Sequence, residues 1–122
     1  MIAIKGEDFS IDEIIEKMKS PRIGAILTYL GTVRGFPSGY GLEFEDNGDA
    51  VQKLEQIEKR AIDSFDIEDV AIIHRVGFLS VSENILLVAV SASRREAAFE
   101  ACRSIINDIK DFHKSWKKEV VK

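Results

Sequence analysis

Three segments of the chain carry hydrophobic residues at helical spacing. The first begins at Ser10 in a capping-box sequence, Ser-Ile-Asp-Glu, and stops before Pro21. The second covers about residues 49–65. The third starts at Ser93 with another capping-box sequence, Ser-Arg-Arg-Glu, and continues to Lys110. We therefore expect three amphipathic helices, each packed by its apolar face on another element.

Strand signals lie before and between these helices. Residues 23–33 are rich in strand-forming residues and nearly continuous in apolar character, which predicts a buried strand. Residues 69–77 and 84–92 are also predicted strands, and the signal is strong at 84–92. Weaker strand signals lie at residues 2–4, 42–45 and 79–81. This order of elements predicts an α+β fold in which helices pack on a largely antiparallel sheet.

Two segments lack a clear hydrophobic period. Residues 34–41, Arg-Gly-Phe-Pro-Ser-Gly-Tyr-Gly, contain three glycines and a proline, which predicts a mobile loop. Residues 111–122 have only a weak period, so we expect coil or a frayed helical turn there. The predicted domain therefore spans residues 1–122 and carries an irregular basic tail from about residue 111.

The composition fits one domain with one sizeable core, because 45% of the 122 residues are hydrophobic and 31% are charged. The 17 Lys and Arg against 21 Asp and Glu give a net charge of −4. This balance argues against a general nucleic-acid-binding protein, which usually presents a basic field. The charge is uneven, however: the segment from Arg103 onward is basic and the rest is acidic. A basic tail on an acidic body predicts a local anion site.

The single cysteine, Cys102, excludes an intrachain disulfide and fits a reducing compartment. It lies on the apolar face of the third helix, so we expect a buried hydrophobe rather than a nucleophile. The N-terminus lacks a signal-peptide pattern and the apolar runs are too short to span a bilayer, which predicts a soluble, cytoplasmic protein. Two histidines and one cysteine give no support for zinc, so no metal is expected. We interpret His74 as structural and His113 as a solvated tail residue.

Two groups of residues are candidates for binding an anion. Arg94 and Arg95 occupy the predicted start of the third helix, where cations oppose the helix dipole but could join free N–H groups in holding a phosphate. Two solvated surface arginines are an equally acceptable interpretation. Arg34 follows Gly31-Thr32-Val33 at the end of a predicted strand, where it could clamp an anion or simply mark a strand–loop junction.

The tail supplies a third candidate. A lone tryptophan, Trp116, must pack on something or expose a large apolar surface. If it anchors the tail, Lys117 and Lys118 are held near the body of the protein, where clustered lysines can act as acids, bases or nucleophiles. Lys110 could belong to the same group, although a lysine near a helix C-terminus is also favourable for structure alone.

Several segments together resemble the large, catalytic subunit of molybdopterin synthase, in the family's order and with near-family spacing. They are residues 24–35, 42–45, 70–81, 88–110 and 116–119, and the resemblance covers about four-fifths of the chain. The resemblance implies an α/β-hammerhead-like fold and a sulfurtransferase without cofactor. It also implies a homodimer within a heterotetramer, paired with a small ubiquitin-like sulfur carrier that ends in a Gly-Gly thiocarboxylate. The implied substrate is cyclic pyranopterin monophosphate, which receives two sulfurs to form the molybdopterin dithiolene.

The resemblance also implies roles for single residues. Lys110 and Lys117 match the family's essential lysines and are the predicted catalytic residues. The family usually has histidine where this chain has Ser93, and serine can cap or donate a hydrogen bond but cannot act as an imidazole acid or base. The predicted substrate-binding residues are Thr32, Val33, Arg34, Ser93, Arg94, Lys118 and Glu119.

Two other classes of function are open at this point. A non-catalytic dimeric module could hold a phosphorylated ligand or a partner's C-terminal tail, and Ser93 in place of histidine is the main support for it. A small nucleic-acid-binding protein would fit the basic tail but conflicts with the net charge of −4.

Overall fold

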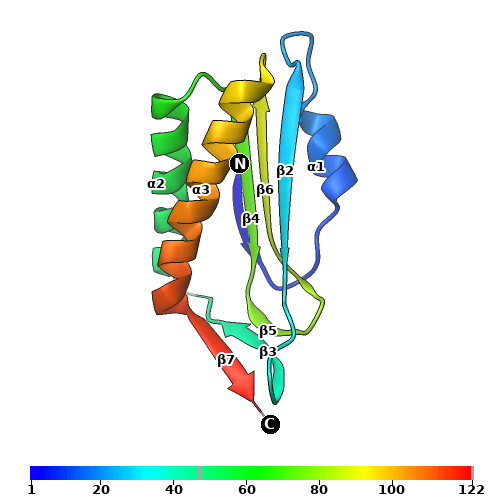
Figure 1. Cartoon of the computed structure of the whole chain (residues 1–122), viewed down its shortest axis with the longest axis vertical. Coiled ribbons are helices and arrows are strands. Elements are labelled where there is room, and N and C mark those ends of the chain that lie inside the picture. Colours follow the sequence, from blue (N-terminus) through cyan, green and yellow to red (C-terminus); the bar gives the residue numbers. More distant parts are fainter. Residues whose placement is uncertain (47, 122) are drawn as a thin grey trace.

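The structure, a computed structural model, describes residues 1–46 and 48–121. Figure 1 shows an elongated molecule in which a larger sheet has helices on both faces and a smaller sheet lies at the end that carries the C-terminus. The elements in chain order are β1 (Ile2–Lys5), α1 (Ile11–Met18), β2 (Ala25–Thr32), β3 (Gly39–Phe44), α2 (Gly48–Ser64), β4 (Asp69–Arg75), β5 (Gly77–Ser80), β6 (Asn84–Ala92), α3 (Arg95–Trp116) and β7 (Lys117–Val121).

The larger sheet has the strand order β1-β4-β6-β2. β1 runs parallel to β4, whereas β6 runs antiparallel to both β4 and β2. Because side chains on a strand alternate between faces, Val70 and Ile72 join the core under α2 and α3, while Ala71 and Ile73 pack with α1. Burial on both faces explains why β4 and β6 have nearly continuous apolar sequences. The predicted α+β class with helices on a largely antiparallel sheet is confirmed.

Helices α2 and α3 lie side by side on one face of this sheet (Figure 1). Their buried residues recur at helical spacing, which is why the period in the sequence located both helices correctly. The buried set is Ala50, Leu54, Ile57 and Ala61 on α2, and Ala98, Ala101, Cys102, Ile105, Ile109 and Trp116 on α3.

The smaller sheet is antiparallel throughout and has the order β5-β3-β7. Strand β3 already begins at Gly39, so the end of the predicted loop 34–41 is part of the sheet. A Cβ atom at Gly41 would lie 2.1 Å from the carbonyl oxygen of Leu79, so only glycine lets β3 approach β5 this closely.

The prediction of coil or a frayed turn for the tail was wrong. Helix α3 continues to Trp116, with Phe112 and Trp116 stacked one turn apart at a ring separation of 5.1 Å, and β7 follows directly. Both features depend on contacts with β3, which is remote in sequence, so the local hydrophobic period does not reveal them. Lys122, the last residue of the predicted tail, lies outside the described residues.

The two predicted capping boxes have different outcomes. The hydroxyl oxygen of Ser10 accepts a hydrogen bond from the backbone N–H of Glu13 at 3.3 Å, so Ser10 caps α1 as predicted. The prediction that Ser93 caps α3 was wrong, because Arg94 holds the N-cap position without a side-chain hydrogen bond. The chain is still alongside β2 at this point, and Gly24 donates a hydrogen bond to the Ala92 carbonyl at 3.0 Å.

Candidate active site

A cavity of about 360 Å³ opens where the last turns of α3 meet the smaller sheet and the end of β2. Its apolar wall includes the side chains of Phe36, Leu42 and Phe44. The size and the mixture of apolar walls with a few polar groups are typical of small-molecule sites. The polar and charged side chains that line it are Thr32, Arg34, Lys110, His113, Lys117 and Glu119.

Three cations predicted from the sequence meet in this cavity. Arg34 comes from the loop after β2, Lys110 from the second-last turn of α3, and Lys117 from the junction of α3 and β7. Among the described residues, Glu119 contributes the one carboxylate of the lining. Three cations against one carboxylate give the cavity an excess of positive charge, which favours anionic ligands such as phosphates and carboxylates.

Strand β7 divides the Lys-Lys-Glu sequence between two faces. Lys117 and Glu119 line the cavity, whereas the intervening Lys118 does not, as the alternation of side chains along a strand requires. Lys118 is the cross-strand neighbour of Glu43 on β3, and such an opposite-charge pair stabilises the pairing of two strands. The structure therefore brings two of these three predicted site residues into the cavity.

Trp116 anchors the tail, as the sequence predicted. The residue is 8% exposed, and its ring packs against Phe44 and His74 with ring separations of 5.1 and 4.3 Å. The indole N–H donates a hydrogen bond to the Glu45 carbonyl oxygen at 2.7 Å. Because β7 starts at the next residue, this anchor sets where Lys117 and Glu119 enter the cavity.

The end of β2 orients Arg34. The register of β2 against β6 shifts between Gly31 and Thr32, and Thr32 lines the cavity. Val33 does not line it: its side chain is 2% exposed, and its backbone exchanges hydrogen bonds with Ser82 and Glu83 at 2.8 and 2.9 Å. The buried Val33 thus ties down the backbone between the two residues that reach the cavity.

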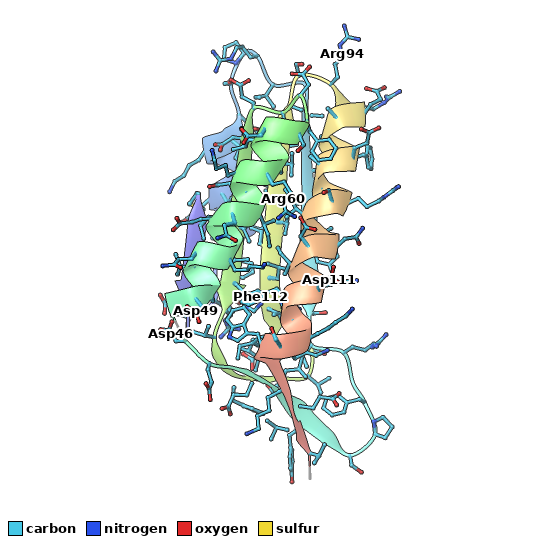
Figure 2. All side chains as sticks on the ribbon, turned by 90° about the vertical axis from the view of Figure 1, so that its left-hand side faces the viewer. Asp46, Asp49, Arg60, Arg94, Asp111 and Phe112 are labelled. Atoms are coloured by element: carbon cyan, nitrogen blue, oxygen red, sulfur yellow. The ribbon has the colours of Figure 1, made fainter. Side chains whose placement is uncertain are left out.

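Ser93 and Arg94 lie at the opposite end of α3 from the cavity. Figure 2 shows Arg94 at one end of this helix and Asp111 and Phe112 near the other. Sixteen residues of helix separate Arg94 from Lys110, which is about 24 Å at 1.5 Å per residue. The arginine side chains at this helix start are exposed and line no part of the cavity. One copy of the chain therefore gathers Arg34, Lys110 and Lys117, but not Arg94.

The two histidines form a pair that the sequence did not predict. Nε2 of His74 lies 2.8 Å from Nε2 of His113, and Nδ1 of His74 lies 2.7 Å from the Arg75 carbonyl oxygen. Burial and then the charge of His113 lower the pKa of His74 to about 3. Burial lowers the pKa of His113 to about 4, with further contributions from Lys117 and Lys110. His113 lines the cavity, so the prediction of a solvated tail residue was wrong.

Cys102 lies away from this cavity on the buried side of α3. Cys102 is 6% exposed, and burial raises the pKa of its thiol. A thiol in such surroundings is a poor source of thiolate at neutral pH. The interpretation of Cys102 as a buried hydrophobe is confirmed.

Comparison with known proteins decides the family. A sequence model of the MoaE protein family matches residues 4–112 of this chain. The chain belongs to the MoaE family. The curated relatives of this MoaE chain include the molybdopterin synthase catalytic subunit of Pyrococcus abyssi, 42% identical over 120 residues that cover 95% of this chain and 81% of the relative. The same subunit of Bacillus subtilis is 38% identical over 113 residues, covering 89% and 72% of the two chains.

Solved structures agree with this assignment. Molybdopterin synthase from Staphylococcus aureus superposes with a TM-score of 0.86 at 28% identity, covering 98% of this chain and 90% of that chain. Molybdopterin cofactor biosynthesis protein E from Burkholderia multivorans has a TM-score of 0.82 at 32% identity, covering 89% and 75%. The family resemblance inferred from the sequence is thus confirmed.

None of the helices within residues 1–46 and 48–121 is long and apolar enough to cross a membrane. In the same residues, no group of three or more His, Cys, Asp or Glu side chains is placed to hold a metal ion.

Sequence reasoning missed His113 and the aromatic wall of the cavity. One signal was available: His113 lies three residues after Lys110 and four before Lys117, so a continuous helix would place all three on one side. The weak apolar period of residues 111–122 hid that continuity. Phe44, which contacts both histidines and Trp116, carried no local signal because its partners come from two elements distant in the sequence, β4 and α3.

Proposed function

We propose that this chain is the catalytic subunit of a molybdopterin synthase and acts as a sulfurtransferase. In this reaction the sulfur of a thiocarboxylated small subunit is transferred to cyclic pyranopterin monophosphate to form the dithiolene. The observation that carries the proposal is the meeting of Arg34, Lys110 and Lys117 in one cavity. Membership of the MoaE family, in which relatives are named molybdopterin synthase catalytic subunits, supports this chemistry for the cavity.

The charge of the cavity suits both reactants. The precursor carries a phosphate and the donor ends in a thiocarboxylate, and both are anions that guanidinium and ammonium groups bind with strong, charge-assisted hydrogen bonds. We assign Arg34 to the precursor, with Thr32 beside it. Lys110 is the proposed group for proton transfer or for contact with the acyl group, and Lys117 positions the partner's C-terminus or the substrate. Glu119 completes the binding surface.

Four of the predicted substrate-binding residues do not line the cavity and need another explanation. Lys118 and Val33 support the cavity through the backbone of β7 and β2 rather than by direct contact. Ser93 and Arg94 would reach a cavity only from a second copy of the chain, which is consistent with the homodimer that the family resemblance implies.

The test is reconstitution with a thiocarboxylated small subunit and the pterin precursor, with detection of the dithiolene product. The Lys110→Ala variant should lose turnover by two orders of magnitude or more, the range typical of removing a general acid or base, while folding and partner binding persist. Lys114→Ala is the matched control, because Lys114 lies one turn further along α3, is exposed and pairs with Asp111 at 3.3 Å. Wild-type turnover by Lys110→Ala would remove the proposed catalyst.

The same assay separates the proposal from a non-catalytic binding module. A module would bind the precursor or the partner's C-terminal tail, yet the wild-type chain would form no dithiolene with an active donor. That result would favour the module, for which Ser93 in place of the family histidine remains the main support.

A further inference from the structure

The hydrogen bonds of the histidine pair, His74 and His113, use three of its four ring nitrogens. His74 on β4 is fully buried, and His113 on α3 is half-buried against it and lines the cavity. The two rings meet edge to face with centroids 5.0 Å apart. The pair therefore connects the protein interior to the cavity that holds Lys110 and Lys117.

The protonation of His74 follows from its partners. A backbone carbonyl can only accept, so Nδ1 of His74 must donate its proton to the Arg75 oxygen 2.7 Å away. The ring is fully buried, and burial disfavours the charged form, so a single proton remains on it. Nε2 of His74 is therefore a bare acceptor.

The protonation of His113 then follows from His74. The two Nε2 atoms are 2.8 Å apart, and two lone pairs at that distance would repel each other. His113 must therefore donate from Nε2, which leaves its Nδ1 as a lone pair when the ring is neutral. The Arg75 carbonyl group thus determines the tautomer of His74, and His74 in turn determines the tautomer of His113.

Among the residues that the structure describes, Nδ1 of His113 is the one ring nitrogen of the pair that is left without a protein partner. It forms no hydrogen bond with any other residue in the described part of the chain. It is also not among the buried polar atoms without a partner, of which Ser91 Oγ is the one example in residues 1–46 and 48–121. Since the ring lines the cavity, this nitrogen is the one that a ligand or a cavity lysine can reach.

Lys117 shares the cavity with His113 and is also joined to it through the backbone. Its backbone N–H donates to the His113 carbonyl in the last turn of α3, so the two residues are joined at the helix end. Among the charged residues near His113, Lys117 has the largest electrostatic effect on it and Lys110 the next largest. The remaining titratable and charged groups that line the same cavity or contact the ring are His74, Arg34 and Glu119.

We propose that His113, held by His74, is a positioning residue that offers a neutral nitrogen lone pair to the ammonium group of Lys117 and so orients this lysine in the cavity. The neutral His113 ring adds a hydrogen-bond acceptor to the cavity without adding charge. A protonated histidine would instead repel the neighbouring ammonium groups. This inference rests on the proposed function of Lys117, but the hydrogen-bond chain beneath it can be tested without any reaction.

The first experiment measures the tautomers by two-bond ¹H–¹⁵N correlation spectra of the ¹⁵N-histidine-labelled protein between pH 5 and pH 8. The expected result is two neutral rings, with His74 protonated on Nδ1 and His113 on Nε2. A charged ring at pH 7, or His113 protonated on Nδ1, overturns the inference whatever the activity of the protein.

The second experiment compares His113→Phe with His113→Gln in the dithiolene assay, with each variant normalised to its folded fraction. Glutamine restores a donor for His74 and an acceptor for Lys117, whereas phenylalanine keeps the ring and supplies neither. We expect kcat to fall about tenfold or more in His113→Phe, with KM for the precursor within about twofold, and largely to recover in His113→Gln.

The outcomes are separable. Equal kcat values in His113→Phe and the wild type overturn the positioning role even if the tautomers are as expected. If the wild type forms no dithiolene at all, the proposed function fails, and the tautomer spectra still decide whether the hydrogen-bond chain exists.

Discussion

Lowering the pH from 8 to 5 should destabilise the fold through His74 and His113. Both folded-state pKa values are depressed, to about 3 and about 4, from an ordinary value of 6.5. The unfolded chain therefore binds protons between pH 6.5 and pH 4 that the folded chain does not. The stabilisation is fully present above pH 6.5 and is lost as the pH falls toward the folded-state pKa values.

The expected size of the effect follows from linkage. At pH 5 each histidine is almost fully protonated in the unfolded chain and almost neutral in the folded chain. The free energy of unfolding should therefore fall by about 2 kcal/mol for each histidine between pH 8 and pH 5, or about 4 kcal/mol for the pair. This is a large share of the stability of a typical small domain.

The measurement is urea unfolding at constant ionic strength, followed by the fluorescence of the single tryptophan, Trp116. Asp8 and Glu83 also have lowered pKa values, through hydrogen bonds from Asn84 and from Ser80 respectively. Their stabilising effect is lost below their ordinary values of 3.8 and 4.5, outside this window. The histidines therefore dominate the change above pH 5.

The matched variant is His113→Gln, which removes one of the two titrating groups and keeps a donor for His74. Its unfolding free energy should vary by about 2 kcal/mol less than that of the wild type across the same window. A wild-type stability that is flat from pH 8 to pH 5, or an unchanged pH dependence in the variant, would refute the reasoning.

Three further predictions concern the cavity and its support. Replacing Trp116 by Phe keeps an aromatic ring but removes the hydrogen bond to the Glu45 carbonyl oxygen. Urea unfolding of this variant and the wild type, followed by circular dichroism, should show a loss of about 1–2 kcal/mol, and an unchanged stability would mean that the anchor is unimportant. Arg34→Ala should raise the dissociation constant of the precursor about tenfold or more, as measured by calorimetry. The control is Arg60→Ala, which should leave that constant unchanged because the Arg60 side chain pairs with Asp108 at 3.2 Å outside the cavity. Equal dissociation constants for Arg34→Ala and the wild type would count against the anion site. Cys102→Ala should retain turnover and lose only about 1 kcal/mol of stability in thermal unfolding, and an inactive but folded variant would reopen a thiol mechanism.

The local pattern predicted most of the elements because their faces repeat with a regular period. Helices α1 and α2 and strands β2, β4 and β6 follow from hydrophobic periods that one element carries by itself. The start of α3 was misplaced by about two residues, since the backbone at Ser93 still lies against Gly24, the residue before β2, and the helix begins only after Arg94. Strand β7 was missed altogether, because five residues with an exposed, charged sequence become a strand only when β3 is available to pair with them.

For the candidate site, too, some features follow from the sequence and others only from the tertiary structure. The sequence by itself determined the kinds of residue available: Arg34 after a strand, two lysines seven residues apart and a lone tryptophan between them. Only the tertiary structure decided that Lys118 faces away from the cavity, that Arg94 lies at the other end of α3 and that His74 reaches His113. The physical reason is that residue chemistry is a local property, whereas the meeting of side chains requires strands and helices from distant parts of the chain to pack together.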